Sequence, residues 1–241
     1  MACAHAVTFA RARSSRARQR GGLSLVRGNG ASGPIGVFGG TFDPIHFGHL
    51  RTALELREIL GLADVRFIPC RVPPHRDKQP SAGALRLDMV HAAVADEDGF
   101  SVDEREFERP GPSYTIDTLA SLRAEVGPRP LCLLLGMDAF LGLPTWHRWT
   151  EILDVAHVVV AHRPGWVMPA DGPLGKLLAQ RRSATPEPLH EDAYGCVFVT
   201  PVTQLEISAT DLRRALARGD DPRFLVPDAV REIIMRSECY R

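Results

Sequence analysis

The feature that most constrains the fold is an alternation, from Pro34 onward, of short apolar runs with longer stretches of helical period. A short apolar run is typical of a strand buried on both faces, and a helix after each strand carries the chain back to start a parallel neighbour. The pattern predicts a single α/β domain, a doubly wound parallel sheet with helices on both faces. We expect strands at 35–38, 65–69, 100–104, 131–135, 157–161 and 196–200, and helices at 47–60, 84–95, 115–125, 149–153, 173–181, 209–217 and 227–236.

The first 33 residues differ from the rest of the chain, because they hold six arginines and no acidic residue. They lack the long apolar core of a secretory signal, and their composition suits an organelle transit peptide, a start-site artefact or a disordered extension of a bacterial protein. We favour the disordered extension and place the folded domain at 34–241.

The charge of that domain argues against a nucleic-acid partner, since residues 34–241 carry 23 basic against 29 acidic side chains. The apolar runs fall far short of the roughly 18–20 residues of a membrane helix, so we expect no membrane anchor. The five cysteines show no paired spacing, which favours a reducing compartment, and hence the cytoplasm, over a disulfide or zinc framework.

The stretch "GVFGGTFDPIHFGHL", residues 36–50, is the strongest functional signal. Gly39 and Gly40 follow the first expected strand, where glycine lets the backbone approach a bulky ligand. The next helix begins directly after the turn, and its N-terminus offers free N–H groups and partial positive charge. The stretch therefore predicts a phosphate site.

His46 and His49 are three residues apart, which places both on the first helical turn with donors for the same anion. Simple capping or solvent-facing histidines are the alternative, and a zinc pair would need a third ligand that the nearby sequence does not offer. The stretch lacks the "GK[ST]" of a Walker loop and the "GxGxxG" dinucleotide fingerprint.

With these residues the chain resembles the nucleotidyltransferases that carry an H-x-G-H signature, which implies a Rossmann-like sheet. The second signature of that family, near the C-terminal end, is matched by "ISATDLR" at 207–213.

Within that superfamily, the middle of the chain resembles the bacterial nicotinate-nucleotide adenylyltransferases. The matching segments are "VPPHRD" (72–77), "ERPGPSYTIDTL" (108–119), "GMDAFLGLPTWHRWTEIL" (136–153) and "VVVAHRPG" (158–165). The resemblance implies adenylyl transfer from ATP to nicotinate mononucleotide in NAD biosynthesis. A phosphopantetheine adenylyltransferase is the nearest rival, but it lacks the Trp146 loop, and a non-catalytic nucleotide sensor is the rival from another class.

The resemblance also implies roles for individual residues. His46, His49 and Arg213 are the expected catalytic residues. ATP is expected at Gly39, Gly40, Thr41, Phe42, His46, His49, Asp138, Ile207, Ser208 and Arg213, and the mononucleotide at His75, Arg76, Tyr114, Thr115, Ile116, Trp146 and His147.

Several of these residues have simpler interpretations. Trp146 is expected to stack on the nicotinate ring but could pack on the domain, and Ser208 could be only a helix N-cap. Tyr114 and Thr115 could likewise cap a helix, and Asp138 could simply form a turn. A lysine usually follows His75 in the family, so Arg76 leaves the phosphate partner at that position open.

We expect direct attack of the mononucleotide phosphate on ATP, without a covalent enzyme intermediate. Mg²⁺ is expected to be carried by ATP rather than by a protein cage. The sequence leaves the oligomeric state, and the preference for nicotinate over nicotinamide mononucleotide, undecided.

Overall fold

The computed structural model describes residues 33–73, 81–162, 167–203 and 205–240. Within these residues seven strands form one sheet in which every pairing is parallel, in the order β3-β2-β1-β4-β5-β7-β6. The strands are β1 (Ile35–Gly40), β2 (Asp64–Pro69), β3 (Phe100–Val102), β4 (Leu131–Gly136), β5 (His157–His162), β6 (Arg182–Ser183) and β7 (Val197–Pro201).

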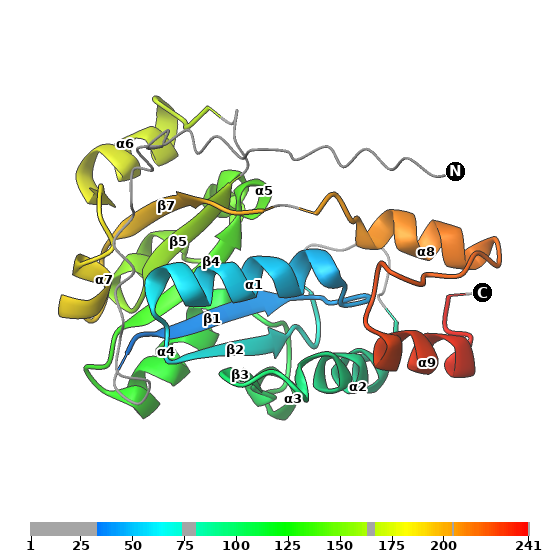
Figure 1. Cartoon of the computed structure of the whole chain (residues 1–241). Coiled ribbons are helices and arrows are strands. Elements are labelled where there is room, and N and C mark those ends of the chain that lie inside the picture. Colours follow the sequence, from blue (N-terminus) through cyan, green and yellow to red (C-terminus); the bar gives the residue numbers. More distant parts are fainter. Residues whose placement is uncertain (1–32, 74–80, 163–166, 204, 241) are drawn as a thin grey trace, which may run out of the picture.

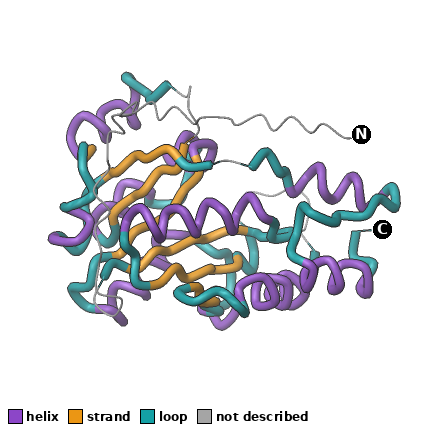
Figure 2. Tube along the Cα trace, in the orientation of Figure 1, coloured by secondary structure: helices purple, strands orange, loops and turns teal. Residues whose placement is uncertain are grey.

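Helices connect and flank these strands (Figures 1 and 2). The α-helices are α1 (Phe47–Leu60), α2 (Gly83–Val94), α3 (Arg105–Glu108), α4 (Thr115–Val126), α5 (Met137–Leu141), α6 (Gly172–Arg181), α7 (Pro188–Glu191), α8 (Ala209–Ala217) and α9 (Asp228–Ser237). Two 3₁₀ helices, η1 (Leu143–Thr145) and η2 (Trp149–Asp154), follow α5.

Each face of the sheet is covered by its own apolar core. Helices α1, α2, α8 and α9 pack on one face, and α4, α5, η2 and α6 pack on the other. Successive side chains of a strand point to opposite faces, so Cys132 and Leu134 of β4 enter the first core while Leu133 and Leu135 enter the second. Both faces are buried, and this is why the strands read as unbroken apolar runs.

The order of the strands creates a reversal between β1 and β4. From β1 the chain proceeds outward to β2 and β3, and then returns to place β4 on the other side of β1. The connections after β1 and β4 therefore diverge to opposite faces, α1 on one and α5 on the other. A crevice at the carboxyl ends of such a pair is where open α/β sheets bind ligands.

The expected doubly wound, Rossmann-like fold is confirmed, and each of the six expected strands is present. The strand expected at 100–104 ends at Val102, and the helix expected at 149–153 is the 3₁₀ helix η2. The sequence pattern missed the elements of two to five residues, β6, α3, α5, α7 and η1, because so short an element shows no periodicity.

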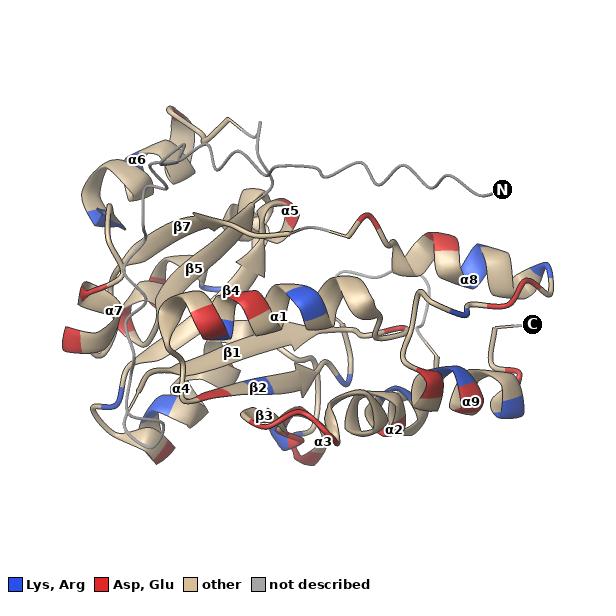
Figure 3. Ribbon diagram, in the orientation of Figure 1, with Lys and Arg blue, Asp and Glu red and all other residues tan. Residues whose placement is uncertain are grey.

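Basic and acidic residues are interspersed along the helices, as the blue and red segments of the ribbon in Figure 3 show. No helix in the described part of the chain is long and apolar enough to cross a membrane. Cys70, Cys132, Cys196 and Cys239, the cysteines that fall within the described ranges, are free thiols.

Leu56 of α1 is fully buried in the first core, so we expect Leu56→Ala to lower the free energy of unfolding by about 2–5 kcal/mol through lost burial and a residual cavity. Leu141→Ala is the control, because Leu141 is 38% exposed and should change stability by about 0.5 kcal/mol or less. Urea unfolding followed by circular dichroism measures both variants. Equal losses would contradict the assignment of Leu56 to the core.

Candidate active site

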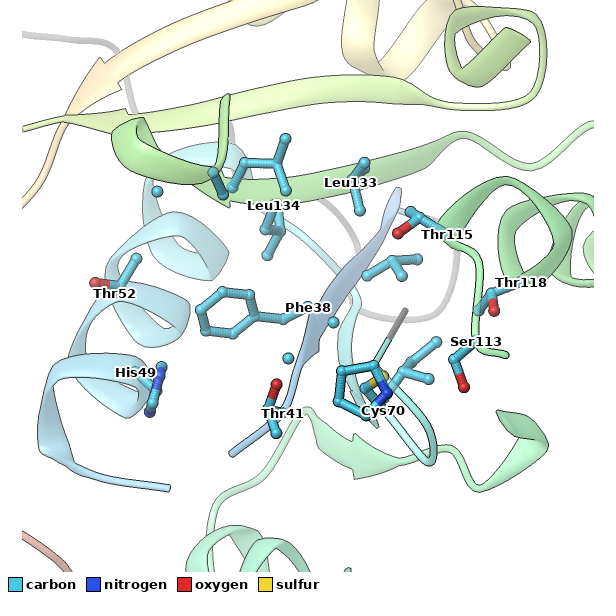
Figure 4. Close-up of a pocket in the computed structure, with 18 of the residues that line it drawn as sticks. Phe38, Thr41, His49, Thr52, Cys70, Ser113, Thr115, Thr118, Leu133 and Leu134 are labelled. Carbon is cyan, nitrogen blue, oxygen red and sulfur yellow. The ribbon is translucent and has the colours of Figure 1, made fainter. Parts of the chain in front are cut away.

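A cavity of about 750 Å³ opens at the carboxyl ends of β1 and β4, at the reversal of strand order. Figure 4 shows its two sides, with His49 and Thr52 of α1 on one side of β1, and Cys70, Ser113, Thr115 and Thr118 on the other. Of the residues expected from the sequence, the cavity is lined by Gly39, Gly40, Thr41, His46, His49, Tyr114, Thr115, Asp138, Trp146, His147 and Ile207.

The turn after β1 brings main chain directly to the cavity. A Cβ atom built on Gly39 would meet no other atom within 4 Å, because this face of the residue opens into the cavity. Phe42 has a left-handed backbone (φ 48°) and is buried at 3% exposure, with its ring against Gly40. Phe42 is not among the residues that line the cavity, and its side chain belongs to the first apolar core.

His46 and His49 form a stacked pair at the start of α1. His46 is the N-cap residue, with extended backbone, rather than the first residue of the helix. The two rings lie 3.7 Å apart between centroids with an interplanar angle of 24°. The His46 main-chain N–H donates to His49 Nδ1 (3.3 Å), so the proton of a neutral His49 ring resides on Nε2. His49 therefore offers an Nε2–H donor at the cavity that it lines.

Burial holds both rings in the neutral form near pH 7. His46 is 5% exposed, and this burial lowers its pKa from 6.5 to about 4. Burial also lowers the pKa of His49 well below 6.5, and a charge on His46 would lower it further. Among the described residues, no group forms a hydrogen bond with His46 Nδ1. An anion bound beside the pair would favour protonation and so oppose these shifts.

Gly48 gives the His46 ring its space. A Cβ on Gly48 would lie 3.0 Å from His46 Nδ1 and Cε1 and 3.3 Å from the Leu205 carbonyl oxygen. This crowding provides a steric reason for the glycine between the two histidines.

Aromatic side chains form the opposite wall. The centroids of the Tyr114 and His147 rings lie 4.3 Å apart. Trp146, which follows η1 and precedes η2 in the chain, also lines the cavity. Trp146 also packs against the second apolar core, so stacking on a ligand and packing on the domain are compatible. Tyr114 occupies the N-cap position of α4, but its side chain makes no capping hydrogen bond.

The N-terminus of α4 faces the same wall. Thr115, the first residue of α4, lines the cavity, and Ile116 follows it with a side chain that is buried in the core. The main-chain N–H groups of a first helical turn have no partner within the helix, so they are suited to an anionic group.

Arg213 and Ser208 lie outside the cavity lining. Arg213 Nη1 donates to the Asp43 carbonyl oxygen (2.6 Å), and Nη2 donates to Thr210 Oγ1 (3.2 Å). Ser208 is the N-cap of α8, where its Oγ accepts from the Asp211 N–H (3.4 Å). Asp138 belongs to the first turn of α5 rather than to an isolated turn. His75 and Arg76 lie outside the described residues.

Sequence reasoning missed a buried acid in the cavity wall. Glu106 is 7% exposed, and its Oε1 accepts from Thr118 Oγ1 (2.7 Å). Burial raises the pKa of its carboxyl group, against lowering contributions from neighbours such as Thr118. The sequence could have indicated Thr118 as a cavity residue, because it lies one helical turn after Thr115 on α4. Glu106 lies on the short helix α3, where the sequence shows no periodic pattern that would indicate it.

Arg86 was missed as well. It is fully buried, and it donates to the carbonyl oxygens of Thr41 (2.7 Å) and Cys70 (2.6 Å), which follow β1 and β2. It also donates to the Ser81 and Arg71 carbonyl oxygens. One side chain thus joins several loops beside the cavity, and a helical arginine in sequence gives no sign of this burial.

The chain is similar in sequence and in fold to known proteins. A family model described as cytidylyltransferase-like matches residues 37–215. A protein from Aeromonas hydrophila named "Probable nicotinate-nucleotide adenylyltransferase" is 50% identical over 208 residues, covering 86% of this chain and 97% of the relative. One of the same name from Methylococcus capsulatus is 47% identical over 207 residues, covering 86% and 99%.

Among solved structures, the fold is similar to that of Plasmodium falciparum nicotinic acid mononucleotide adenylyltransferase complexed with NaAD. The TM-score is 0.67 at 15% identity, covering 86% of this chain and 97% of that one.

The low pKa values of the histidine pair predict a pH dependence of stability. An unfolded histidine takes up a proton near pH 6.5 and buried His46 only near pH 4, so stability should fall as pH is lowered between these values. The free energy of unfolding of His46→Gln should fall less over this range, because the variant keeps the titration of His49 but lacks that of His46. Urea unfolding at several pH values measures the difference, and parallel curves for the two proteins would contradict the assigned shift.

Proposed function

The chain belongs to the nicotinate-nucleotide adenylyltransferases of the cytidylyltransferase-like family, and we propose that it transfers the adenylyl group of ATP to nicotinate mononucleotide. The products are nicotinate adenine dinucleotide and pyrophosphate, and the reaction belongs to NAD biosynthesis. The observation that carries this proposal is the two-sided cavity, with a histidine pair at one helix N-terminus and an aromatic wall at another.

In the proposed step, an oxygen of the 5′-phosphate of nicotinate mononucleotide attacks the α-phosphorus of ATP. A bond forms between this oxygen and the α-phosphorus, which creates the P–O–P linkage of the dinucleotide. The bond from the α-phosphorus to the oxygen that bridges it to the β-phosphorus breaks, and its electron pair leaves with pyrophosphate. Neither substrate must be activated by a covalent enzyme intermediate, so the protein acts by positioning the substrates and stabilising charge.

On the ATP side, we assign His49 Nε2–H as a donor to the phosphate oxygens, with His46 stacked against it. Their low pKa values support a pair that is neutral before ATP binds and gains positive character beside the triphosphate. We assign Arg213 as the third catalytic residue, and its guanidinium already lies at this turn, where Nη1 donates to the Asp43 carbonyl oxygen. The remaining ATP contacts are assigned to Gly39, Gly40, Thr41, Phe42, Asp138, Ile207 and Ser208.

On the acceptor side, the Tyr114–His147 pair and Trp146 provide flat apolar surface for the pyridine ring. The N–H groups of Ile116 and His147 are assigned to its carboxylate, because the first turn of α4 favours an anion. His75 and Arg76 are assigned to the same substrate from the sequence alone.

Mg²⁺ is assigned to the triphosphate, where it would neutralise charge on the departing pyrophosphate. Glu106 and Asp138 are the acidic residues among those that line the cavity, and they come from α3 and α5. No group of three or more His, Cys, Asp or Glu side chains in the described ranges could hold a metal ion. This donor set fits an ion that arrives with ATP and keeps most of its waters.

We further propose a cytoplasmic location and no nucleic-acid partner. The free thiols of the described cysteines support a reducing compartment, and the excess of acidic over basic residues in 34–241 supports the absence of a nucleic-acid partner.

The direct test is to incubate the protein with ATP, Mg²⁺ and, in separate reactions, nicotinate mononucleotide, nicotinamide mononucleotide or phosphopantetheine, and to identify products by mass. We expect nicotinate adenine dinucleotide and pyrophosphate. Dephospho-coenzyme A would indicate the rival transferase, and nucleotide binding without any product would indicate a sensor.

His49→Ala should reduce kcat by about 10²–10³, because one preorganised donor to the reacting phosphate is lost. The control is His91→Ala, since His91 lies on α2 and its Nε2 contacts Glu104 at the exposed surface (2.8 Å). Pyrophosphate release with both substrates saturating measures the effect. Turnover of His49→Ala within a few-fold of wild type would overturn the role assigned to His49.

A further inference from the structure

The turn between β1 and α1 contains a buried carboxylate outside the cavity lining. Asp43 is 4% exposed, and it lies between Thr41 and His46, both of which line the cavity. A buried charge is costly unless it is hydrogen-bonded, so the partners of this carboxylate constrain the turn.

Those partners come from segments that are distant in the sequence. Tyr240, which follows α9, donates its hydroxyl to Asp43 Oδ1 at 2.8 Å. Arg213 of α8 donates to the Asp43 carbonyl oxygen at 2.6 Å and lies 3.8 Å from Oδ2. Asp43 is therefore held from two sides, and Figure 1 shows α8 and α9 on the side towards which the arrows of β1 and β2 point.

The rest of the turn is fixed separately. Arg86 donates to the Thr41 carbonyl oxygen (2.7 Å), and the Phe47 N–H donates to the Leu225 carbonyl oxygen (3.1 Å), just before α9. Between these two points, the side chain of Asp43 accepts a hydrogen bond from the Tyr240 hydroxyl.

Tyr240 is suited to a fixed donor role. Burial raises the pKa of its hydroxyl, and the Asp43 carboxylate raises it further, so the hydroxyl keeps its proton at any pH at which the protein works. A hydroxyl donating to a carboxylate makes a charge-assisted bond, which is stronger than a bond between neutral groups.

We propose that Tyr240 and Asp43 are positioning residues that hold the Thr41–His46 turn in its ATP-binding geometry. The inference rests on the proposed function, because it assigns ATP to that turn. Neither residue touches the reacting atoms in this proposal. Tyr240 acts through Asp43, and Asp43 acts through the main chain that leads to His46.

Tyr240→Phe tests the inference, because it removes the hydroxyl and keeps the ring. We expect kcat/KM for ATP to fall roughly tenfold, while KM for nicotinate mononucleotide stays within about twofold of wild type. Tyr194→Phe is the matched control, since Tyr194 is 48% exposed and does not line the cavity. The assays are run well below the unfolding temperature. A merely structural bond would lower that temperature and leave the kinetic constants unchanged, which would overturn the proposal.

Asp43→Asn weakens the same bond from the other side and keeps the shape of the side chain, so it carries the test if Tyr240→Phe folds poorly. If the two residues act through one bond, the double variant should lose no more than about the larger single loss. Multiplying losses would contradict the proposal.

A binding readout separates this proposal from the proposed function. The affinity for a non-hydrolysable ATP analogue with Mg²⁺, measured by calorimetry, should fall at least about fivefold in Tyr240→Phe and stay unchanged in Tyr194→Phe. Wild-type protein that binds the analogue but forms no dinucleotide would defeat the proposed function and leave this test valid. Unchanged affinity together with unchanged kinetics in Tyr240→Phe would overturn the positioning role.

Discussion

The parallel pairing of β1 with both β2 and β4 is the constraint on which the site depends. Because the three strands run in one direction, their carboxyl ends meet at one edge, and the chain must leave that edge towards two different faces. The divergence opens a cavity flanked by the N-termini of α1 and α4. Two helix N-termini that face one cavity suit a pair of anionic substrates better than a neutral one.

The histidine pair shows how the fold tunes this edge. A charged imidazole would suit a phosphate, yet burial keeps both rings neutral near pH 7. The hydrogen bond from the His46 main chain fixes which nitrogen of His49 carries the proton. The site therefore provides an oriented hydrogen-bond donor rather than a permanent positive charge. This avoids the free-energy cost of burying two neighbouring cations.

The sequence was sufficient for most of the fold and for one side of the site. Short apolar runs and helical periods located the long elements, and the turn with Gly39 and the histidines was visible because such residues have no use in a core. Glu106 and Arg86 were not visible, because burial of a charged side chain depends on carbonyl and hydroxyl partners that only the tertiary fold brings together. The same limit hid the contact of Arg213 with Asp43, since it joins residues 170 positions apart.

The bond between Tyr240 and Asp43 spans 197 residues, nearly the whole length of the domain. During synthesis the β1–α1 turn is made 197 residues before Tyr240, so the turn exists without this contact while the intervening chain is translated. Contacts of such long range close late, after the loop-closure entropy of the intervening chain has been overcome. The sheet around β1 and β4 can assemble earlier, and the finished geometry of the turn follows only when the segment beyond α9 has docked. The turn beside the cavity therefore depends on a segment that lies almost a whole domain length away along the chain.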